Sequence, residues 1–440
     1  MTRPPSPAAL RPPRPSRLKV RALRELEAWV RVRALRWSVR RARRRIAPGR
    51  VVAVTGSVGK TSTKELIADM AAARGPSTRS PGTWNGARAL AATLRGAPPG
   101  GGVCVLEIGA KRRGWLAQAA DLLRPDVVVV TNVLGDHVRE FGSLEAIAEE
   151  KSELVAGLAP GGTAVLNADD PLVAAMRRRC RGRVLSYGRA EGADLRAVDV
   201  RADWPARLAF TLLHEDRARR VQTRLVGGHH VGVALAALGG ALAAGVPLDD
   251  AVAVLERAEP QPGRFAVRRA AGVDFLRDDF KAAISSYGPA LDLLRTAAVR
   301  RRVAVLGKVN HYQGGEAEAY LAMAERAAAA ADHVIFTGFT AWRVLGGAAL
   351  PGDGRVRVVE TVREATEAVR ALVEPGDLVL LKGDFEDDHL ARVALDFEAP
   401  VTCWEHACGR MALCDGCERL RVPAPPPSAA SGPGAGPPVR

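Results

Sequence analysis

The chain has 440 residues, which is enough for two or three domains with separate hydrophobic cores. A hydrophobic content of 47% and a charged content of 25% are typical of a globular protein, and no stretch reaches the roughly 18 to 20 apolar residues of a membrane span. The net charge of +16 is concentrated in residues 1–50, which hold sixteen Lys/Arg and two acids. Because the remaining residues are nearly neutral and carry no basic-aromatic stripe, the composition argues against nucleic-acid binding.

The basic N-terminal segment, residues 1–49, is predicted to be an appendage of the folded body. Residues 1–17 are rich in Pro and Arg and are expected to be disordered, whereas residues 18–46 place Leu, Val and Trp among arginines, as a basic amphipathic helix does. Two interpretations stay open for this helix: it packs on the body, or it contacts an anionic membrane or a partner protein peripherally. The segment lacks the features of a signal peptide, so we expect a cytoplasmic protein, membrane-peripheral under the second interpretation.

From residue 51 onward, short apolar stretches alternate with helical patterns. Stretches typical of buried strands occupy residues 51–54, 103–107, 127–131 and 164–167. The last three lead into a polar residue, namely Glu107, Asn132 and Asn167. This pattern predicts a doubly wound parallel sheet, which binds ligands at the carboxyl ends of its strands.

A second alternating series follows the turn Gln261-Pro262-Gly263, with apolar stretches at 303–306, 333–336, 356–359 and 378–381. We therefore predict an α/β protein: a central P-loop ATPase domain with a doubly wound parallel sheet at 50–262, and a smaller Rossmann-like α/β domain at 263–400. Residues 421–440 are rich in Pro, Ala, Gly and Ser and are expected to form a disordered tail.

The first strand runs into a glycine-rich loop, and a helical pattern follows at once. The loop is Thr55-Gly56-Ser57-Val58-Gly59-Lys60-Thr61-Ser62. Its glycines let backbone N–H groups close around phosphate oxygens, Lys60 can reach the terminal phosphates, and Thr61 can offer its hydroxyl to magnesium. The spacing between the glycines is shorter than in the usual Walker loop. With a strand before it and a helix after it, the loop predicts ATP binding by residues 55–62.

The sequence of this loop resembles the corresponding loop of the Mur ligase family, whose members use ATP to join amino acids or peptides to a carboxylate. Other segments resemble the family in the same order along the chain: 80–86, 105–110, 131–137, 141–145, 150–151, 165–171 and 262–264. The resemblance covers residues 51 to about 395. Within the family, these sequence motifs most resemble those of the branch that adds D-alanyl-D-alanine to the UDP-N-acetylmuramoyl tripeptide.

The resemblance implies an ATP-dependent acid–amino acid ligase, active in cell-wall or related peptide biosynthesis. In this family a carboxylate attacks the γ-phosphate of ATP, and an amine then attacks the acyl phosphate. Two magnesium ions are implied. Thr61 and Glu107 would bind one ion, and the site of the second would be formed by Glu107, His137 and Lys151. A cationic lysine cannot bind magnesium, so the resemblance implies that Lys151 is carbamylated. The implied catalytic residues are Lys60, Lys151, His137 and Arg264.

Further contacts with the nucleotide are also implied by the resemblance. They comprise Asn167 and His230 near the adenine, Arg264 at the γ-phosphate, Asp279 at the ribose and Lys281 along the phosphates. The chain has His229-His230 where the family has a His-Asn pair, and the segment 278–283 departs from the closest branch. Lys382-Gly383-Asp384 stands at the place of a Lys-Gly strand end, and a simple turn explains it equally well.

Only about 50 residues precede the phosphate loop, so we expect the family's N-terminal UDP-binding domain to be missing. Under this expectation another chain supplies substrate binding, or the activated carboxylate is not a UDP-linked precursor. An alternative function is a catalytically weakened Mur-like scaffold that binds ATP and a partner. The presence of Lys60, Thr61, Glu107, His137 and Lys151 together argues against it.

The last feature is a cysteine cluster within residues 401–420. Its four members are Cys403, Cys408, Cys414 and Cys417. Four thiolates in 15 residues can form a tetrahedral structural zinc site, which we predict, while reactive redox thiols and unpaired structural cysteines are the alternatives. The other two cysteines stand alone, so the chain has no disulfide framework.

Overall fold

The computed structural model describes residues 36–47, 49–97, 102–110, 112–352, 354–406, 408–410 and 412–422. The expectations for residues 1–35 and 423–440, which cover the N-terminal stretch, most of the basic helix and nearly all of the C-terminal tail, lie outside the described residues. In the part of the chain that is described, no helix is both long and apolar enough to cross a membrane.

The first half of the chain builds a nine-stranded sheet in the order β2-β3-β1-β4-β5-β6-β7-β8-β9. Neighbouring strands are parallel from β2 to β7, and β7, β8 and β9 are antiparallel. The strands are β1 (Val51–Thr55), β2 (Ser77–Arg79), β3 (Val103–Glu107), β4 (Val127–Val130), β5 (Thr163–Asn167), β6 (Arg183–Gly188), β7 (Leu195–Arg201), β8 (Ala209–His214) and β9 (Arg217–Gln222).

The central strands β1, β3 and β4 are buried along their whole length, as expected of parallel strands that are covered on both faces. The predicted doubly wound parallel sheet is therefore confirmed. The antiparallel strands β7 to β9 were not predicted. The edge strand β9 reads Arg-Ala-Arg-Arg-Val-Gln and is largely exposed, so it lacks the apolar run that marks a buried strand.

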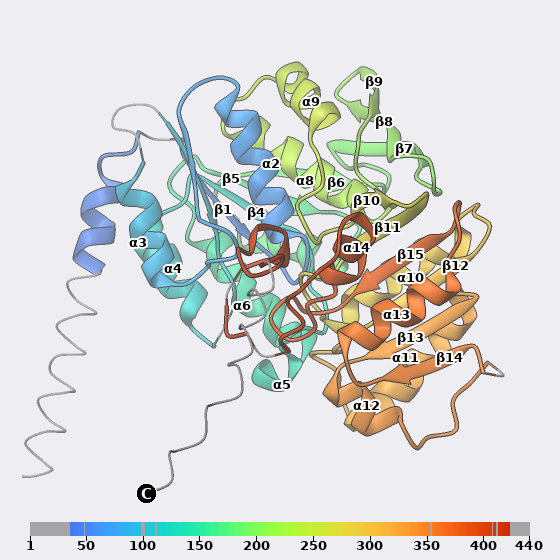
Figure 1. The fold of residues 1–440 in the computed structure, drawn as a ribbon. Helices are drawn as coiled ribbons and strands as arrows, with labels where there is room; N and C mark the ends of the chain where they lie inside the picture. Colours follow the sequence, from blue (N-terminus) through green and yellow to red (C-terminus); the bar gives the residue numbers. More distant parts are fainter. Residues whose placement is uncertain are drawn as a thin grey trace, which may run out of the picture.

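Helices cover both faces of this sheet (Figure 1). One face carries α2 (Lys60–Ala72), α8 (His230–Ala243) and α9 (Leu248–Arg257), which share a buried apolar cluster with the sheet. The opposite cluster is formed by α3 (Ala87–Arg95), α4 (Trp115–Leu123), α5 (Val138–Phe141), α6 (Leu144–Ala156), α7 (Pro171–Ala174), η1 (Ala175–Arg179) and the helical residues 36–43 with Ile46. The described part of the basic helix thus packs on the body.

The second half builds a six-stranded sheet in the order β10-β11-β15-β12-β13-β14. Its strands are β10 (Ala266–Ala270), β11 (Val273–Asp278), β12 (Arg302–Leu306), β13 (His333–Thr337), β14 (Val356–Val359) and β15 (Leu378–Lys382). All pairs are parallel except the hairpin of β10 and β11. The predicted second α/β sheet is confirmed, and its antiparallel hairpin was not predicted.

Helices also cover both faces of the second sheet. One apolar cluster contains α10 (Tyr287–Thr296), α11 (Glu316–Ala330) and α12 (Phe339–Leu345), preceded by the short η2 (Ile284–Ser286). The other contains α13 (Val362–Leu372) and α14 (Ala391–Glu398). α13 begins with a capping box, in which Thr361 and Glu364 satisfy each other's backbone N–H groups.

The C-terminal segment, residues 401–422, packs on the second domain. Val401, Cys414 and Leu420 form a small apolar cluster with Ala391 and Leu395 of α14. The segment contains the 3-10 turn η3 (Cys414–Gly416). It therefore lies against the second sheet's outer layer.

Candidate functional site

The phosphate loop lies between β1 and α2, and β1 is an interior strand between β3 and β4. Gly59 caps α2 in the left-handed region, with φ 81°. Gly56 has φ 146°, and a Cβ at this position would lie 1.8 Å from Thr131 Oγ1. Because only glycine tolerates both conditions, the loop depends on it here. The backbone therefore brings the N-terminus of α2 to the carboxyl edge of the sheet, a geometry that binds phosphate.

The residues that follow β4 brace the loop. Asn132 Oδ1 accepts hydrogen bonds from the backbone N–H groups of Ser57 at 3.2 Å and Val58 at 2.9 Å. The Thr131 hydroxyl donates to the Val58 carbonyl at 2.7 Å, and the Leu134 N–H donates to the Ser57 hydroxyl at 2.9 Å. The sequence placed Asn132 at a strand end and gave it no role. Its role in shaping the loop follows from the strand order, which sets β4 beside β1.

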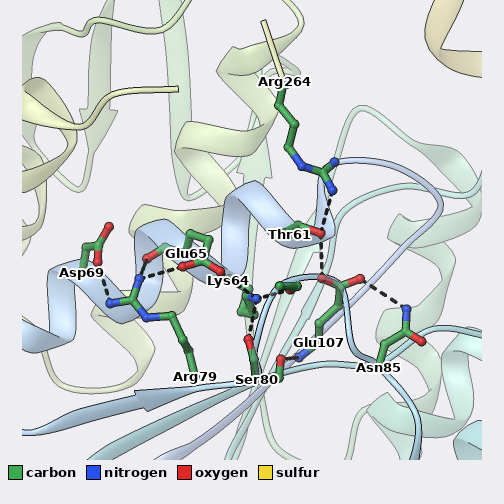
Figure 2. A network of polar contacts seen from close by, with 10 residues as sticks. Thr61, Lys64, Glu65, Asp69, Arg79, Ser80, Asn85, Glu107 and Arg264 are labelled. Carbon is green, nitrogen blue, oxygen red and sulfur yellow. Dashed lines mark hydrogen bonds and ion pairs between the residues drawn. The ribbon is translucent and has the colours of Figure 1, made fainter. Parts of the chain in front are cut away.

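Thr61, Glu107 and Arg264 meet although they come from three separate elements (Figure 2). The Thr61 hydroxyl donates to Glu107 Oε2 at 2.7 Å, and Arg264 Nη2 donates to Thr61 Oγ1 at 3.3 Å. Asn85 Nδ2 lies 3.4 Å from the other Glu107 oxygen. Glu107 is 2% exposed at the end of β3. An arginine that precedes the second sheet thus contacts the phosphate loop of the first.

Lys60 and Lys151 are two amines close enough for their charges to interact; Lys151 is buried and Lys60 is partly buried. The Lys60 ammonium donates to the loop carbonyls of Gly56 at 2.8 Å and Ser57 at 2.6 Å. Burial lowers the pKa of Lys60, against the opposing effect of Glu107 and Asp136. Burial and then the charge of Lys60 lower the pKa of Lys151 to about 7. An amine with such a pKa is largely neutral at slightly alkaline pH, which makes it a nucleophile.

Asp136 is a site residue to which the sequence gave no role. It is 6% exposed, and its charge partly offsets the lowering of the pKa of both Lys60 and Lys151. Its Oδ1 accepts a hydrogen bond from the Ser285 hydroxyl of the second domain at 2.7 Å. The position of Asp136 between Gly135 and His137 was visible in the sequence, but its partner lies about 150 residues away. Asp136 therefore links the two domains beside the phosphate loop.

His137 points toward the second domain. Its ring meets that of His311 at 4.7 Å between centroids, and its Nδ1 lies 3.7 Å from Glu140 Oε2. Burial and then the neighbouring His311 lower the pKa of His137. Among the described residues, these contacts do not join His137 to Glu107 or Lys151, with which it was predicted to serve a magnesium ion. Nearby, Arg139 donates to the Gly314 carbonyl at 3.3 Å, another contact between the domains.

Two residues predicted to contact the adenine are held by the backbone. Asn167 ends β5, and its Nδ2 donates to the Thr131 carbonyl at 2.8 Å. His230 begins α8, and its Nδ1 lies 2.7 Å from the Val226 carbonyl oxygen. Burial lowers the pKa of His230 to about 4, so its ring is neutral. Its neighbour His229 packs against Phe265 with the rings tilted by 53° and their centroids 4.2 Å apart.

The second domain presents three predicted site residues on one side. The Arg264 guanidinium lies over the Phe280 ring, 4.4 Å from its centroid, and burial lowers the pKa of Arg264. Asp279 is 1% exposed, and Arg277 binds both of its oxygens, at 3.2 and 3.1 Å. The Lys281 ammonium lies 3.4 Å from Glu386. Asp279 is therefore buried and paired with Arg277, while Lys281 stays accessible at the surface of the same domain.

Lys382, which the sequence left open as a turn residue, is buried at the end of β15. It is 1% exposed, and its ammonium lies 2.9 Å from Asp278 Oδ2. Burial raises the pKa of Asp278 to about 6, and Lys382 counteracts that rise. The Lys382 ammonium also donates to the Lys281 carbonyl at 2.7 Å. This lysine therefore ties β15 to the loop that carries Asp279 and Lys281.

The four clustered cysteines are free thiols. Cys414 is buried, and its sulfur lies 3.6 Å from His389 Nδ1. Across the described residues, no three His, Cys, Asp or Glu side chains gather in the way a metal site requires. The zinc site therefore stays a prediction. For magnesium, the Thr61 hydroxyl and the Glu107 carboxylate, which lie 2.7 Å apart, are oxygen donors of the type that the ion prefers and would fit it.

A phosphate loop that faces a buried acid and is reached by an arginine from a second α/β domain defines a two-domain enzyme acting on a nucleotide phosphate. Comparison with known families identifies it further. The Mur ligase middle domain matches residues 54–241, and the family's C-terminal domain, described as the glutamate ligase domain, matches residues 263–385. The chain belongs to the Mur ligase family, and it is an ATP-dependent acid–amino acid ligase.

Individual relatives agree with this assignment. The chain is 34% identical to the UDP-N-acetylmuramoyl-tripeptide–D-alanyl-D-alanine ligase of Mycobacterium bovis, over 76% of this chain and 70% of that protein. The enzyme of the same name from Escherichia coli is 31% identical, over 72% and 68%. MurF of Acinetobacter baumannii has a similar structure, with a TM-score of 0.72, 25% identity and coverage of 83% and 80%. MurF of Thermotoga maritima, solved in complex with ADP, shares the fold with a TM-score of 0.70 and 24% identity, over 83% of each chain.

Proposed function

We propose that this ligase activates a carboxylate of a peptide-bearing precursor with ATP and joins it to the amine of an amino acid or dipeptide. The names of its relatives specify a UDP-N-acetylmuramoyl tripeptide and D-alanyl-D-alanine, which we propose as the first substrates to test. The observation that carries the proposal is the contact of Arg264 with Thr61, because it brings the second domain onto the phosphate loop. Such closure is what an acyl phosphate needs to be kept from water.

The residues of the chain divide the reaction between them. A carboxylate oxygen attacks the γ-phosphorus of ATP, the bond to the β-phosphate breaks, and ADP leaves. Lys60 and Arg264 face the charge that develops on the transferred phosphoryl group, since both lie at the loop. The amine then attacks the acyl carbon, phosphate departs and the amine loses a proton. The positions of Lys60 and Arg264 support their role as catalytic residues.

We further propose that Thr61 and Glu107 hold magnesium with the phosphates, and that carbamylated Lys151 and His137 serve a second ion. Lys151 supports this because it is 2% exposed and its pKa is lowered to about 7, so its neutral amine can react with carbon dioxide and release a proton. The modification would turn a cation into an anionic oxygen donor. His137 would have to turn from His311 toward the phosphates.

For the nucleotide, we propose Asn167 and His230 near the adenine, Asp279 toward the ribose and Lys281 along the phosphates. The burial of His230 supports a neutral, hydrogen-bonding ring. The Lys281 side chain is 47% exposed, and its ammonium lies 3.6 Å from Asp384 and 3.4 Å from Glu386. Its ion pairs with these two acids would have to exchange for phosphate contacts.

The test is phosphate release by the purified chain. ATP and magnesium are supplied with the tripeptide precursor and D-alanyl-D-alanine, and in parallel with other carboxylates and pooled amino acids. Release that requires both an acid and an amine supports the ligase reaction, and its dependence on the acid identifies the substrate class. Glu107→Gln is the matched variant, since it keeps the shape of a side chain that is already buried. Absence of turnover with every pair would contradict the proposal, and the scaffold alternative, which the relatives' activities do not favour, would gain support.

We also propose that the exposed face of residues 36–46 contacts an anionic membrane surface. Val39, Ala42 and Ile46 are buried against the body, while Trp37 is 63% exposed and the Arg41 guanidinium lies over its ring. A cavity of about 410 Å³ beside α3 is lined by Arg41, Arg45 and Arg95, among others. Basic residues next to an exposed aromatic ring suit an interface with anionic lipid.

Vesicle co-sedimentation of the full chain tests this contact. We expect binding to vesicles containing phosphatidylglycerol, little binding to neutral vesicles, and loss of binding in Arg41→Glu/Arg45→Glu. Arg363→Glu, a reversal on the exposed surface of α13, is the control. Equal binding by all three proteins would overturn the proposal.

Zinc in the cysteine cluster remains our proposal for the C-terminal segment, supported by four thiols within 15 residues and by the buried Cys414 next to His389. Metal analysis of the intact chain and of Cys403→Ser/Cys408→Ser provides the test. We expect about one zinc per intact chain. An intact chain purified without added chelator and still free of zinc would contradict the proposal and favour free thiols.

A further inference from the structure

A row of ion pairs connects the C-terminal segment to the side of the second domain where we propose that the nucleotide binds. Glu398 at the end of α14 accepts from Arg268 of β10 at 2.8 Å, and Arg268 also lies 3.4 Å from Asp415 of η3. Asp415 accepts from Arg277 of β11 at 2.5 Å, and Arg277 in turn binds Asp279. Acidic residues and arginines thus alternate along this row of ion pairs, from the surface to the interior.

Burial increases along this path. The side chains of Glu398 and Arg268 are each 33% exposed, Asp415 is 23% exposed, and Arg277 and Asp279 are 3% and 2% exposed. Arg277 is therefore a buried cation that both carboxylates must compensate. A buried charge is costly when it is left unpaired, so Arg277 depends on Asp415 as well as on Asp279.

Asp279 lies at the connection between the two domains. A Cβ on Gly263 would lie 3.2 Å from Asp279 Oδ1, and the Phe280 N–H donates to the Gly263 carbonyl at 3.1 Å. The next residue, Arg264, contacts Thr61 of the phosphate loop. The position of the Asp279 carboxylate is thus coupled to the turn that carries Arg264 across the site.

The segment that carries Asp415 is itself anchored. Arg421 donates to the Leu395 carbonyl at 2.8 Å, and the Thr402 N–H donates to the Leu420 carbonyl at 2.9 Å. Asp415 stands in the turn Cys414–Gly416, whose Cys414 is buried against α14. The segment therefore holds its carboxylate in a defined place over Arg277. Residues 401–422 also lie beyond the part matched to the Mur ligase domains, which ends at residue 385.

We propose that Asp415 is a positioning residue for the nucleotide site: by holding Arg277 it fixes the Asp279 carboxylate beside the turn Gly263-Arg264. The cysteine-rich segment is then a functional part of the ligase, which sets the affinity for ATP from outside the two catalytic domains. This inference rests on the proposed contact of Asp279 with the nucleotide.

The test compares two single substitutions in the full-length chain. Asp415→Asn removes the negative charge that pairs with Arg277, whereas Glu398→Gln removes only the outer carboxylate that pairs with Arg268 and is the matched control. We expect Asp415→Asn to raise KM for ATP about tenfold with kcat changed less than about twofold, and Glu398→Gln to leave both near the parent values. Asp415→Glu should restore most of the affinity, because it keeps the carboxylate.

Several outcomes would overturn the inference. One is an Asp415→Asn enzyme with unchanged KM for ATP, whatever its melting temperature. Another is an equal rise of KM in Glu398→Gln, which would indicate a general loss of order at this surface. If Asp279→Asn binds ATP with the affinity of the parent, the Asp279 carboxylate does not contribute to nucleotide binding. The proposed positioning role of Asp415 would then be wrong. Phosphate release that depends on both substrates would still establish the ligase reaction in that case.

Discussion

Gly56→Ala is the substitution whose cost the structure defines most sharply. The new Cβ would lie 1.8 Å from Thr131 Oγ1 and 3.1 Å from the Asn132 N–H nitrogen, and the backbone has φ 146°. Backbone strain of about 1–3 kcal/mol and overpacking of about 1–3 kcal/mol combine to roughly 2–6 kcal/mol of lost stability. The loop must also move by about 1 Å, which we expect to weaken the reaction about 100-fold.

The assay pairs thermal unfolding with ATP binding by calorimetry. Gly75→Ala is the control, because that glycine has open space around its Cβ position and an ordinary φ. Thr131→Ala removes the clashing oxygen but also the hydrogen bond to the Val58 carbonyl, so alone it should cost about 1 kcal/mol. The double substitution should recover part of the stability lost in Gly56→Ala, since the two changes share one contact. Parent-like stability and ATP binding in Gly56→Ala, or strict additivity in the double substitution, would refute this reasoning.

Three further predictions concern charge and closure. Glu107→Gln should lower kcat at least about tenfold in the phosphate-release assay, because an amide replaces the buried carboxylate on Thr61, and an unchanged kcat would remove Glu107 from the site. Lys151→Ala should abolish turnover, and mass spectrometry under mild conditions should detect the carbamate in the parent. Since the pKa of Lys151 is about 7, its amine is protonated below that pH and neutral above it, so turnover with added bicarbonate should rise between about pH 6 and 8. A flat profile would contradict this. Ser285→Ala removes the hydrogen bond to Asp136, which should destabilise the closed arrangement of the two domains by about 1 kcal/mol. We expect KM for the substrates to rise about fivefold without a comparable change in melting temperature.

Much of the fold follows from local patterns that a single sequence shows. The central strands β1, β3 and β4 are continuous runs of buried apolar residues, and the predicted segments coincide with them. The strands β7 to β9 and the hairpin of β10 and β11 escaped prediction. Both lie at sheet edges and include exposed charged residues, so their hydrophobic pattern is weak.

The site was partly predictable because some of its residues lie in local sequence patterns. Lys60 and Thr61 lie next to glycines in one short loop, and their placement follows from that loop. Glu107 was identified as a strand-end acid, and the strand order β3-β1 brings it to Thr61. Asp136 and Ser285 were missed, because a contact between two polar residues in different domains leaves no periodic signal.

The sequence by itself determined the phosphate loop, the two α/β halves and the order of the site segments, because these depend on local periodicity and on glycine and proline chemistry. Only the tertiary structure decided which side chains meet. It set Arg264 on Thr61, turned His137 toward His311, and placed Asp415 over the buried Arg277. Such contacts arise from domain packing, and a buried charge accepts whichever partner the packing brings within hydrogen-bonding distance.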